Sequence, residues 1–188
     1  MTAAGGLLLA GGGHSHALLL KRWGMQPELR PQQSITLVNR SSTALYSGMV
    51  PGLIAGVYQR DELAIDLRQL CDRAGVAFVE AEIIGLDPEQ NRLKLQGRPE
   101  LHFDWLSLDV GAVSRRSATG IPIKPLEASL AFLENEDPSS PKPLRVIGAG
   151  AAGLEVVLAL RRRWPQRALQ LQQRPGQLDP AIRKILKR

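Results

Sequence analysis

The sequence contains little cysteine, few aromatic side chains and no long hydrophobic run, and each shortage excludes a class of protein. A single cysteine, Cys71, excludes an intrachain disulfide, a CxxC redox pair and a multi-cysteine zinc site. No uninterrupted stretch of about 18 apolar residues occurs, so no membrane-spanning helix is predicted. The first four residues, MTAA, carry no basic side chain, so the leucine-rich stretch after them does not resemble a signal peptide. We therefore expect a cytoplasmic protein without a transmembrane segment.

Positive charge is concentrated toward one end of the chain. The 188 residues include 24 Lys and Arg against 18 Asp and Glu, which makes the formal net charge +6. Residues 145–188 hold 10 basic and 2 acidic side chains, whereas the rest of the chain holds 14 basic and 16 acidic ones. Only one aromatic residue, Trp164, lies in the basic segment, although single-stranded nucleic acids are usually bound by several aromatic side chains. Nucleic-acid binding is therefore the weakest hypothesis, and no nucleic-acid partner is expected.

The first 40 residues have the pattern of a βαβ unit. A short apolar run, typical of a strand buried on both faces, is followed by three glycines and then by residues that favour a helix. A second β-rich run completes the unit. The predicted elements are a strand over 7–10, a glycine turn over 11–13, a helix over 15–23 that Gly24 ends, and a strand over 35–38.

The same order of elements returns near the end of the chain. There we predict a strand over 144–147, a glycine turn over 148–153, a helix over 154–164 and a strand over 168–173. Between the two units the pattern predicts a helix over 61–75 and strands over 76–79, 83–86, 92–95 and 101–108, with a small antiparallel crossover hairpin among them. Residues 112–143 lack a regular pattern, and 135–143 have the composition of a linker. The predicted fold class is α/β, Rossmann-like, with a central parallel sheet and the start of a second Rossmann-like unit.

The second glycine turn satisfies GxGxxG at Gly148, Gly150 and Gly153, between a predicted strand and a predicted helix. In such a turn the first glycine makes the tight bend, the second lets a pyrophosphate approach the backbone, and the third brings helix and strand together. The helix N-terminus then faces the phosphate charge. This context favours a dinucleotide site over a bare βαβ turn.

The first turn and both second strands depart from the usual pattern. Gly11 and Gly13 fit, but His16 stands at the third position, where it either forces the helix away from the strand or turns its ring aside. The acidic residue that binds a ribose hydroxyl is replaced by Asn39 in the first unit and Gln173 in the second, each followed by an arginine. The choice between NADH and NADPH stays open.

The two glycine turns, together with the stretches GGGHSHALLLKRWGM, ALYSGMVPGLIAGVY and DWLSLDVGAVS, resemble the FAD-dependent pyridine nucleotide–disulfide oxidoreductase superfamily. Within it they are most similar to type II NADH dehydrogenases and to the flavoprotein module that precedes selenide, water dikinase in fusion proteins. The resemblance implies FAD in the first unit and NAD(P)H in the second. Neither a dikinase domain nor the active-site cysteine pair of the disulfide reductases is present in this sequence.

The resemblance assigns cofactor-binding roles by position. For FAD these fall on the pyrophosphate turn, Gly11, Gly13, His14 and Ser15; on the adenosine side, Asn39, Arg40 and Ile83; beside the riboflavin, Ser47, Gly48, Met49 and Pro51; and on the closing glycine, Gly111. For NAD(P)H they fall on Gly148, Gly150, Gly153 and Glu155. Because the two cofactors carry the chemistry, no catalytic side chain is named, and no metal site is expected.

The resemblance also implies a longer protein. Family members are about twice this length by the usual size of such domains, and their returning Gly-Asp segment and C-terminal domain have no counterpart here. We expect an FAD-binding domain over 1–134, a linker over 135–143 and an incomplete NAD(P)H-binding domain over 144–188, as the N-terminal portion of an oxidoreductase that passes hydride from nicotinamide to flavin. The alternative is a non-catalytic dinucleotide-binding remnant or partner-dependent module.

Overall fold

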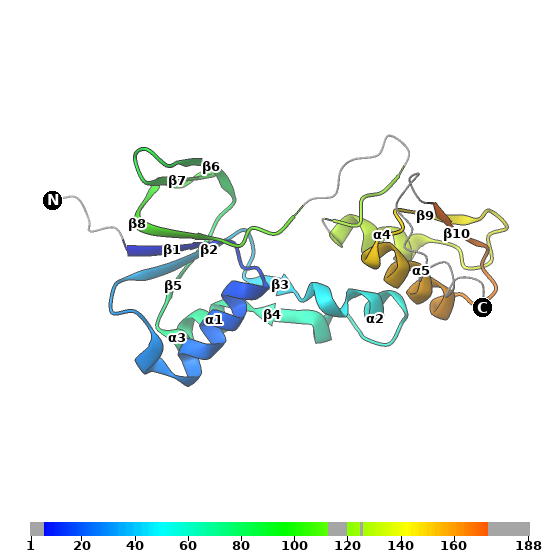
Figure 1. Cartoon of the computed structure of the whole chain (residues 1–188), viewed down its shortest axis with the longest axis horizontal. Helices are drawn as coiled ribbons and strands as arrows, with labels where there is room; N and C mark the ends of the chain where they lie inside the picture. Colours follow the sequence, from blue (N-terminus) through cyan, green and yellow to red (C-terminus); the bar gives the residue numbers. More distant parts are fainter. Residues whose placement is uncertain (1–5, 113–119, 125, 173–188) are drawn as a thin grey trace. The chain divides into compact units, whose positions relative to one another are not determined.

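The computed structural model describes residues 6–112, 120–124 and 126–172 (Figure 1). The chain forms two compact units. Unit 1 comprises Met1–Tyr46 and Ala64–Ala112, and unit 2 comprises Ser47–Leu63 and Val113–Arg188. Within the described ranges, no helix combines the length and the apolar character needed to cross a bilayer.

Unit 1 is built on a six-stranded sheet in the order β5-β2-β1-β8-β7-β6. Neighbours among the first four strands pair in parallel, and β7 pairs antiparallel with both β8 and β6. The strands are β1 (Gly6–Ala10), β2 (Ile35–Asn39), β5 (Ala77–Glu80), β6 (Ile83–Asp87), β7 (Arg92–Leu95) and β8 (Leu101–Leu108). The predicted α/β class, with its parallel sheet and antiparallel hairpin, is confirmed.

Two helices cover one face of this sheet, as Figure 1 shows: α1 (His14–Met25) and α3 (Leu67–Ala74). Their apolar sides pack on alternate strand residues such as Leu9 and Leu37, while the opposite face of the sheet packs on the β6–β7 hairpin. A short 3-10 helix, η1 (Pro27–Leu29), follows α1, and a small antiparallel pair, β3 (Thr43–Leu45) and β4 (Ala64–Asp66), completes the unit.

Two helix predictions in unit 1 need correction. Gly24 does not end the first helix, which runs two residues further than predicted and stops at Met25. The predicted helix over 61–75 is interrupted, because residues up to Asp66 form a 3-10 turn and the strand β4. The Asp66 carboxylate then accepts the Gln69 N–H at 2.9 Å and starts α3. Gly75 ends α3 as predicted, with the left-handed φ of +63°.

Unit 2 contains the second βαβ unit, in which β9 and β10 pair in parallel. Its elements are η2 (Ser47–Met49), α2 (Val50–Ile54), η3 (Asp61–Leu63), α4 (Leu126–Asn135), β9 (Leu144–Ile147), α5 (Ala151–Arg163) and β10 (Leu169–Gln172). The helix α4 lies where no regular pattern was predicted. It buries Ser129 and Leu130, and the Ser129 hydroxyl donates to the Leu126 carbonyl at 2.9 Å.

One arginine of the basic segment is buried in unit 2. Arg167, between α5 and β10, exposes 4% of its surface. Its guanidinium donates to the carbonyl oxygens of Asp137 and Ser140 and forms an ion pair with Glu136. The segment predicted as a linker is thus tied to the corner between α5 and β10, and this positive charge does not face solvent. By contrast, the three arginines that end α5 are exposed.

Cys71 lies in the core of unit 1, as its place on an apolar helical stripe predicted. Burial of the thiol, assisted by the neighbouring Asp72 carboxylate, raises the pKa of Cys71 from its ordinary 9.0 to about 12. Between these values the unfolded chain releases the thiol proton while the folded chain keeps it, so stability falls as pH rises. Above pH 9, we expect the free energy of unfolding of the wild type, measured with urea, to fall by up to about 1.4 kcal/mol per pH unit more than that of Cys71→Ala. Equal pH dependence of the two proteins would contradict this.

Candidate functional site

The first glycine turn connects β1 to α1, and its backbone N–H groups bond within the protein. Gly11, with a left-handed φ of +91°, donates to the Val38 carbonyl at 2.8 Å. Gly12 donates to the side-chain oxygen of Asn39 at 2.8 Å, and Gly13 donates to the Asp109 carbonyl at 3.1 Å. All three N–H groups therefore donate to acceptors within the protein.

The N-terminus of α1 is capped by a carboxylate from a distant strand. Asp109, just after β8, accepts the N–H groups of Ser15 and His16 through one oxygen, at 2.9 and 3.2 Å. Sequence reasoning did not single out this residue, although its position after a strand that pairs with β1 is a usable signal. The carboxylate lies where the positive end of the helix would otherwise face a phosphate.

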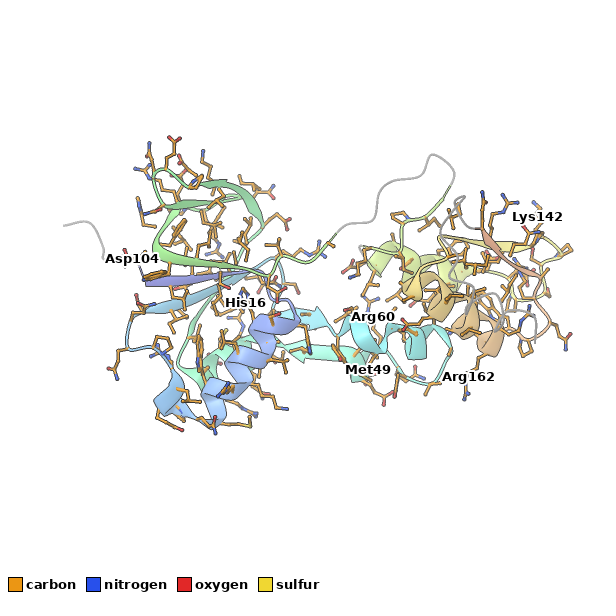
Figure 2. All side chains as sticks on the ribbon, viewed as in Figure 1. His16, Met49, Arg60, Asp104, Lys142 and Arg162 are labelled. Atoms are coloured by element: carbon orange, nitrogen blue, oxygen red, sulfur yellow. The ribbon has the colours of Figure 1, made fainter. Side chains whose placement is uncertain are left out.

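His16, at the third motif position, is buried and both of its ring nitrogens form hydrogen bonds within unit 1. The ring is 3% exposed and lies at the N-terminal end of α1 (Figure 2). Its Nδ1–H donates to the Gly11 carbonyl at 2.6 Å, which leaves Nε2 to accept from the Ser107 hydroxyl at 2.8 Å. His16 thus joins the turn, α1 and β8, and is part of the structural frame of the turn.

The other FAD-related candidates of unit 1 lie around this turn or along its sheet. Besides accepting from Gly12, the Asn39 amide donates to the Ser41 carbonyl at 2.7 Å. The exposed ring of His14 stacks on Tyr46 with ring centroids 4.7 Å apart. The remaining candidates are Arg40, which is exposed; Ile83, which begins β6 and is half-buried; and Gly111, which is exposed with a φ of +76°.

The candidates predicted beside the riboflavin belong to unit 2. Ser47 and Gly48 are exposed in η2, which also contains the half-buried Met49, and Pro51 is half-buried in α2. Packing between α2 and α5 is accompanied by a 3.4 Å hydrogen bond from the Arg163 guanidinium to the Ile54 carbonyl.

The second glycine turn, between β9 and α5, is open. Gly148 has a φ of +115° and donates to the Gln172 carbonyl at 2.8 Å. Among the described residues, no atom lies within 4 Å of a Cβ built on Gly148 or Gly150, whereas a Cβ on Gly153 would lie 1.8 Å from the Gly148 carbonyl oxygen. Within the described part of the chain, no side chain accepts from the first N–H groups of α5. Gly153 therefore serves close packing, and the other two glycines leave room for a ligand.

The structure describes one of the remaining residues expected near NAD(P)H but not the residues expected near its ribose. Glu155 is exposed on the first turns of α5. Gln173 and Arg174, expected at the end of the following strand, lie outside the described residues, since β10 is described to Gln172.

Several solved structures with a similar fold are oxidoreductases by name, and their sequence identity to this chain is low. A ferredoxin reductase from Rhodopseudomonas palustris matches with a TM-score of 0.72 and 19% identity, over 96% of this chain and 46% of its own. An NAD-dependent persulfide reductase from A. fulgidus has a TM-score of 0.71 and 20% identity, over 96% and 37%. An NADH:rubredoxin oxidoreductase from Clostridium acetobutylicum has a TM-score of 0.65 and 14% identity, over 98% and 50%.

These likenesses establish the Rossmann-like fold. This chain spans about a third to a half of the length of the solved proteins that it matches. No protein-family model and no curated protein sequence matches it.

Proposed function

We propose that this chain is a dinucleotide-binding portion of an FAD-dependent NAD(P)H oxidoreductase, in which hydride passes from nicotinamide to flavin and then to an acceptor. The second glycine turn carries the proposal: within the described ranges no side chain caps the N-terminus of α5, and no atom lies within 4 Å of a Cβ built on Gly148 or Gly150. The names of structural neighbours support the reaction class: they include an NAD-dependent persulfide reductase and an engineered NADPH oxidase solved with NADPH.

The residues present fit NAD(P)H at the second turn. Gly148 and Gly150 would hold the pyrophosphate against the N-terminus of α5, and the exposed Glu155 would lie toward the nicotinamide. When bound, a nicotinamide would supply a hydride that a flavin could accept, and the chain's own residues would have to bind and orient the two groups. At the first turn, Asp109 and internal hydrogen bonds use the backbone donors, so FAD would have to displace the Asp109 carboxylate in order to bind there.

We also propose where the protein acts and what it binds. We place the protein in the cytoplasm, with dinucleotides as its small-molecule partners. The similarity of its glycine-turn segments to the flavoprotein module fused to selenide, water dikinase associates it with selenium metabolism. A non-catalytic dinucleotide-binding module is the second candidate, and it is favoured by the occupied first turn.

Gly150→Ala is the variant that tests binding at the second turn. Gly150 has a φ of −77° and free space around a built Cβ, so alanine is compatible with the fold. The added methyl group would stand where the pyrophosphate approaches the backbone. We expect the dissociation constant of NADH or NADPH, measured by calorimetry, to rise about tenfold or more, which corresponds to about 1.4 kcal/mol.

Gly85→Ala is the matched control, since it adds the same methyl group on β6 in unit 1 at ordinary contact distance from Lys94. It should leave the affinity unchanged. Failure of the wild type to bind either nucleotide at millimolar concentration, or equal affinity of Gly150→Ala and wild type, contradicts the proposal. Oxidation of NADH by the FAD-loaded chain with ferricyanide as acceptor favours the oxidoreductase, whereas binding without oxidation favours the non-catalytic module.

A further inference from the structure

The geometry points to Asp109 as an internal anion that competes with a dinucleotide pyrophosphate for the first glycine turn and so sets the affinity of that turn. The inference rests on the proposed function, because it concerns the site assigned to FAD. Asp109 is not among the residues to which the resemblance assigns a cofactor-binding role, and its carboxylate would weaken binding.

Asp109 occupies the donors that an anion would use. Its carboxylate accepts from the N–H groups of Ser15 and His16, two of the first three N–H groups of α1. These N–H groups have no partner within a helix and form the anion-binding end of its dipole. A phosphate and the Asp109 carboxylate cannot both accept these hydrogen bonds.

The carboxylate also occupies the space in front of the turn. A Cβ built on Gly13 would lie 2.1 Å from one carboxylate oxygen and 2.4 Å from the other. The side chain of Asp109 therefore lies directly against the Cα of Gly13, on the surface that the second motif glycine leaves clear for a pyrophosphate. A phosphate brought to this surface would also be repelled by the negative charge of the carboxylate.

The backbone of Asp109 is held by hydrogen bonds that do not involve its carboxylate. The Asp109 N–H donates to the Ala10 carbonyl at 2.8 Å, and the Asp109 carbonyl accepts from Gly13 at 3.1 Å. Side-chain rotation alone would move the carboxylate away from the helix, with β8 and the turn staying paired. The second turn provides the contrast, since Gly150 has open space in front of it and no side chain of the described residues caps α5.

Asp109→Ala and Asp109→Asn separate the charge of this side chain from its occupancy of the turn. The binding experiment uses the full chain and FAD, with flavin fluorescence quenching as the readout. We expect Asp109→Ala to bind FAD about tenfold more tightly than wild type or better, because the pyrophosphate gains free donors and loses a repelling charge. Asp109→Asn should be intermediate, since its amide oxygen still accepts from the helix but carries no charge.

Asp104→Ala is the matched control, because it removes the same charge from β8, the strand that Asp109 directly follows. Asp104 lies between the residues of β8 that pair with Gly6 and Leu7, at the end of the sheet away from the turn (Figure 2). It should leave FAD affinity unchanged. Amide hydrogen exchange gives a readout independent of activity: exchange at Ser15 and His16 should quicken in ligand-free Asp109→Ala, and added FAD should restore protection.

Each outcome decides between the inference and its alternatives. If Asp109→Ala and Asp109→Asn bind FAD no more tightly than a wild type that binds it, Asp109 is a structural helix cap only and the inference is overturned. If wild type and both variants all fail to bind FAD, the FAD half of the proposed function fails and the inference fails with it. NADH binding at the second turn, measured on the same samples, then reports separately on the other half. If Asp109→Ala does not fold, tighter binding by Asp109→Asn than by wild type is the supporting result.

Discussion

Replacement of Arg167 by alanine is expected to destabilise unit 2 by about 3 to 5 kcal/mol, the range measured when one partner of a buried ion pair is removed. The Arg167 side chain is 2% exposed and that of Glu136 is 19% exposed, so the carboxylate left behind would be poorly solvated. The carbonyl oxygens of Asp137 and Ser140 would lose their donors as well. Because each 1.4 kcal/mol is a factor of ten, amide exchange along α5 should become about a hundredfold faster or more.

Arg162→Ala provides the control for this experiment, since Arg162 lies on the exposed side of the end of α5 (Figure 2). Its effect should stay within about 0.5 kcal/mol, as for most surface substitutions. Arg167→Lys keeps the charge but replaces a planar fork of donors with a single ammonium, so an intermediate loss is expected. A change below about 1 kcal/mol for Arg167→Ala would show that the 136–140 segment is not held by this side chain.

Gly153→Ala is expected to cost unit 2 about 1 to 2 kcal/mol in net stability. The new Cβ would lie 1.8 Å from the carbonyl oxygen of Gly148 and 2.9 Å from its carbonyl carbon, both of which are backbone atoms. The helix and the turn would have to separate, and overpacking of this kind typically costs 1 to about 3 kcal/mol. This loss must also outweigh the gain of about 1 kcal/mol that alanine brings over glycine inside a helix.

Gly150→Ala is the natural comparison, because it makes the same change three residues earlier, where no atom of the described part of the chain lies within 4 Å of the new group. Its unfolding free energy should remain within about 1 kcal/mol of wild type. The two variants should therefore have opposite phenotypes: Gly150→Ala folds normally and binds nucleotide weakly, and Gly153→Ala loses stability. Equal stability of the two in urea unfolding would contradict the packing role of Gly153.

The elements predicted well are those coded by contiguous residues. Both βαβ units appear as predicted because an apolar run, a glycine turn and a helical segment are each specified within a few residues. The interrupted helix before α3 was missed because the capping carboxylate of Asp66 competes with an apolar helical pattern that extends further. The helix α4 was missed because its surroundings, rich in proline and polar residues, hid a ten-residue helical stretch.

The group that faces the first turn depends on contacts between residues that lie far apart in the sequence. Asp109 reaches Ser15 across 94 residues, and His16 reaches Ser107 across 91. Both contacts exist because β8 pairs in parallel with β1, which brings the end of β8 beside the start of α1. Sequence spacing predicted a glycine turn there, but the identity of the group in front of it depended on strand order.

By itself, the sequence determined the two Rossmann-like units, the positions of their glycine turns and the location of Cys71 in the core, since each follows from local spacing and hydrophobic periodicity. Only the tertiary structure decided that the first turn is closed by Asp109 while the second is open, and that Arg167 is buried rather than part of a basic surface. The physical reason is that hydrogen bonds and ion pairs between distant segments depend on which strands and loops become neighbours. The local sequence around each residue does not indicate which distant residue it will contact.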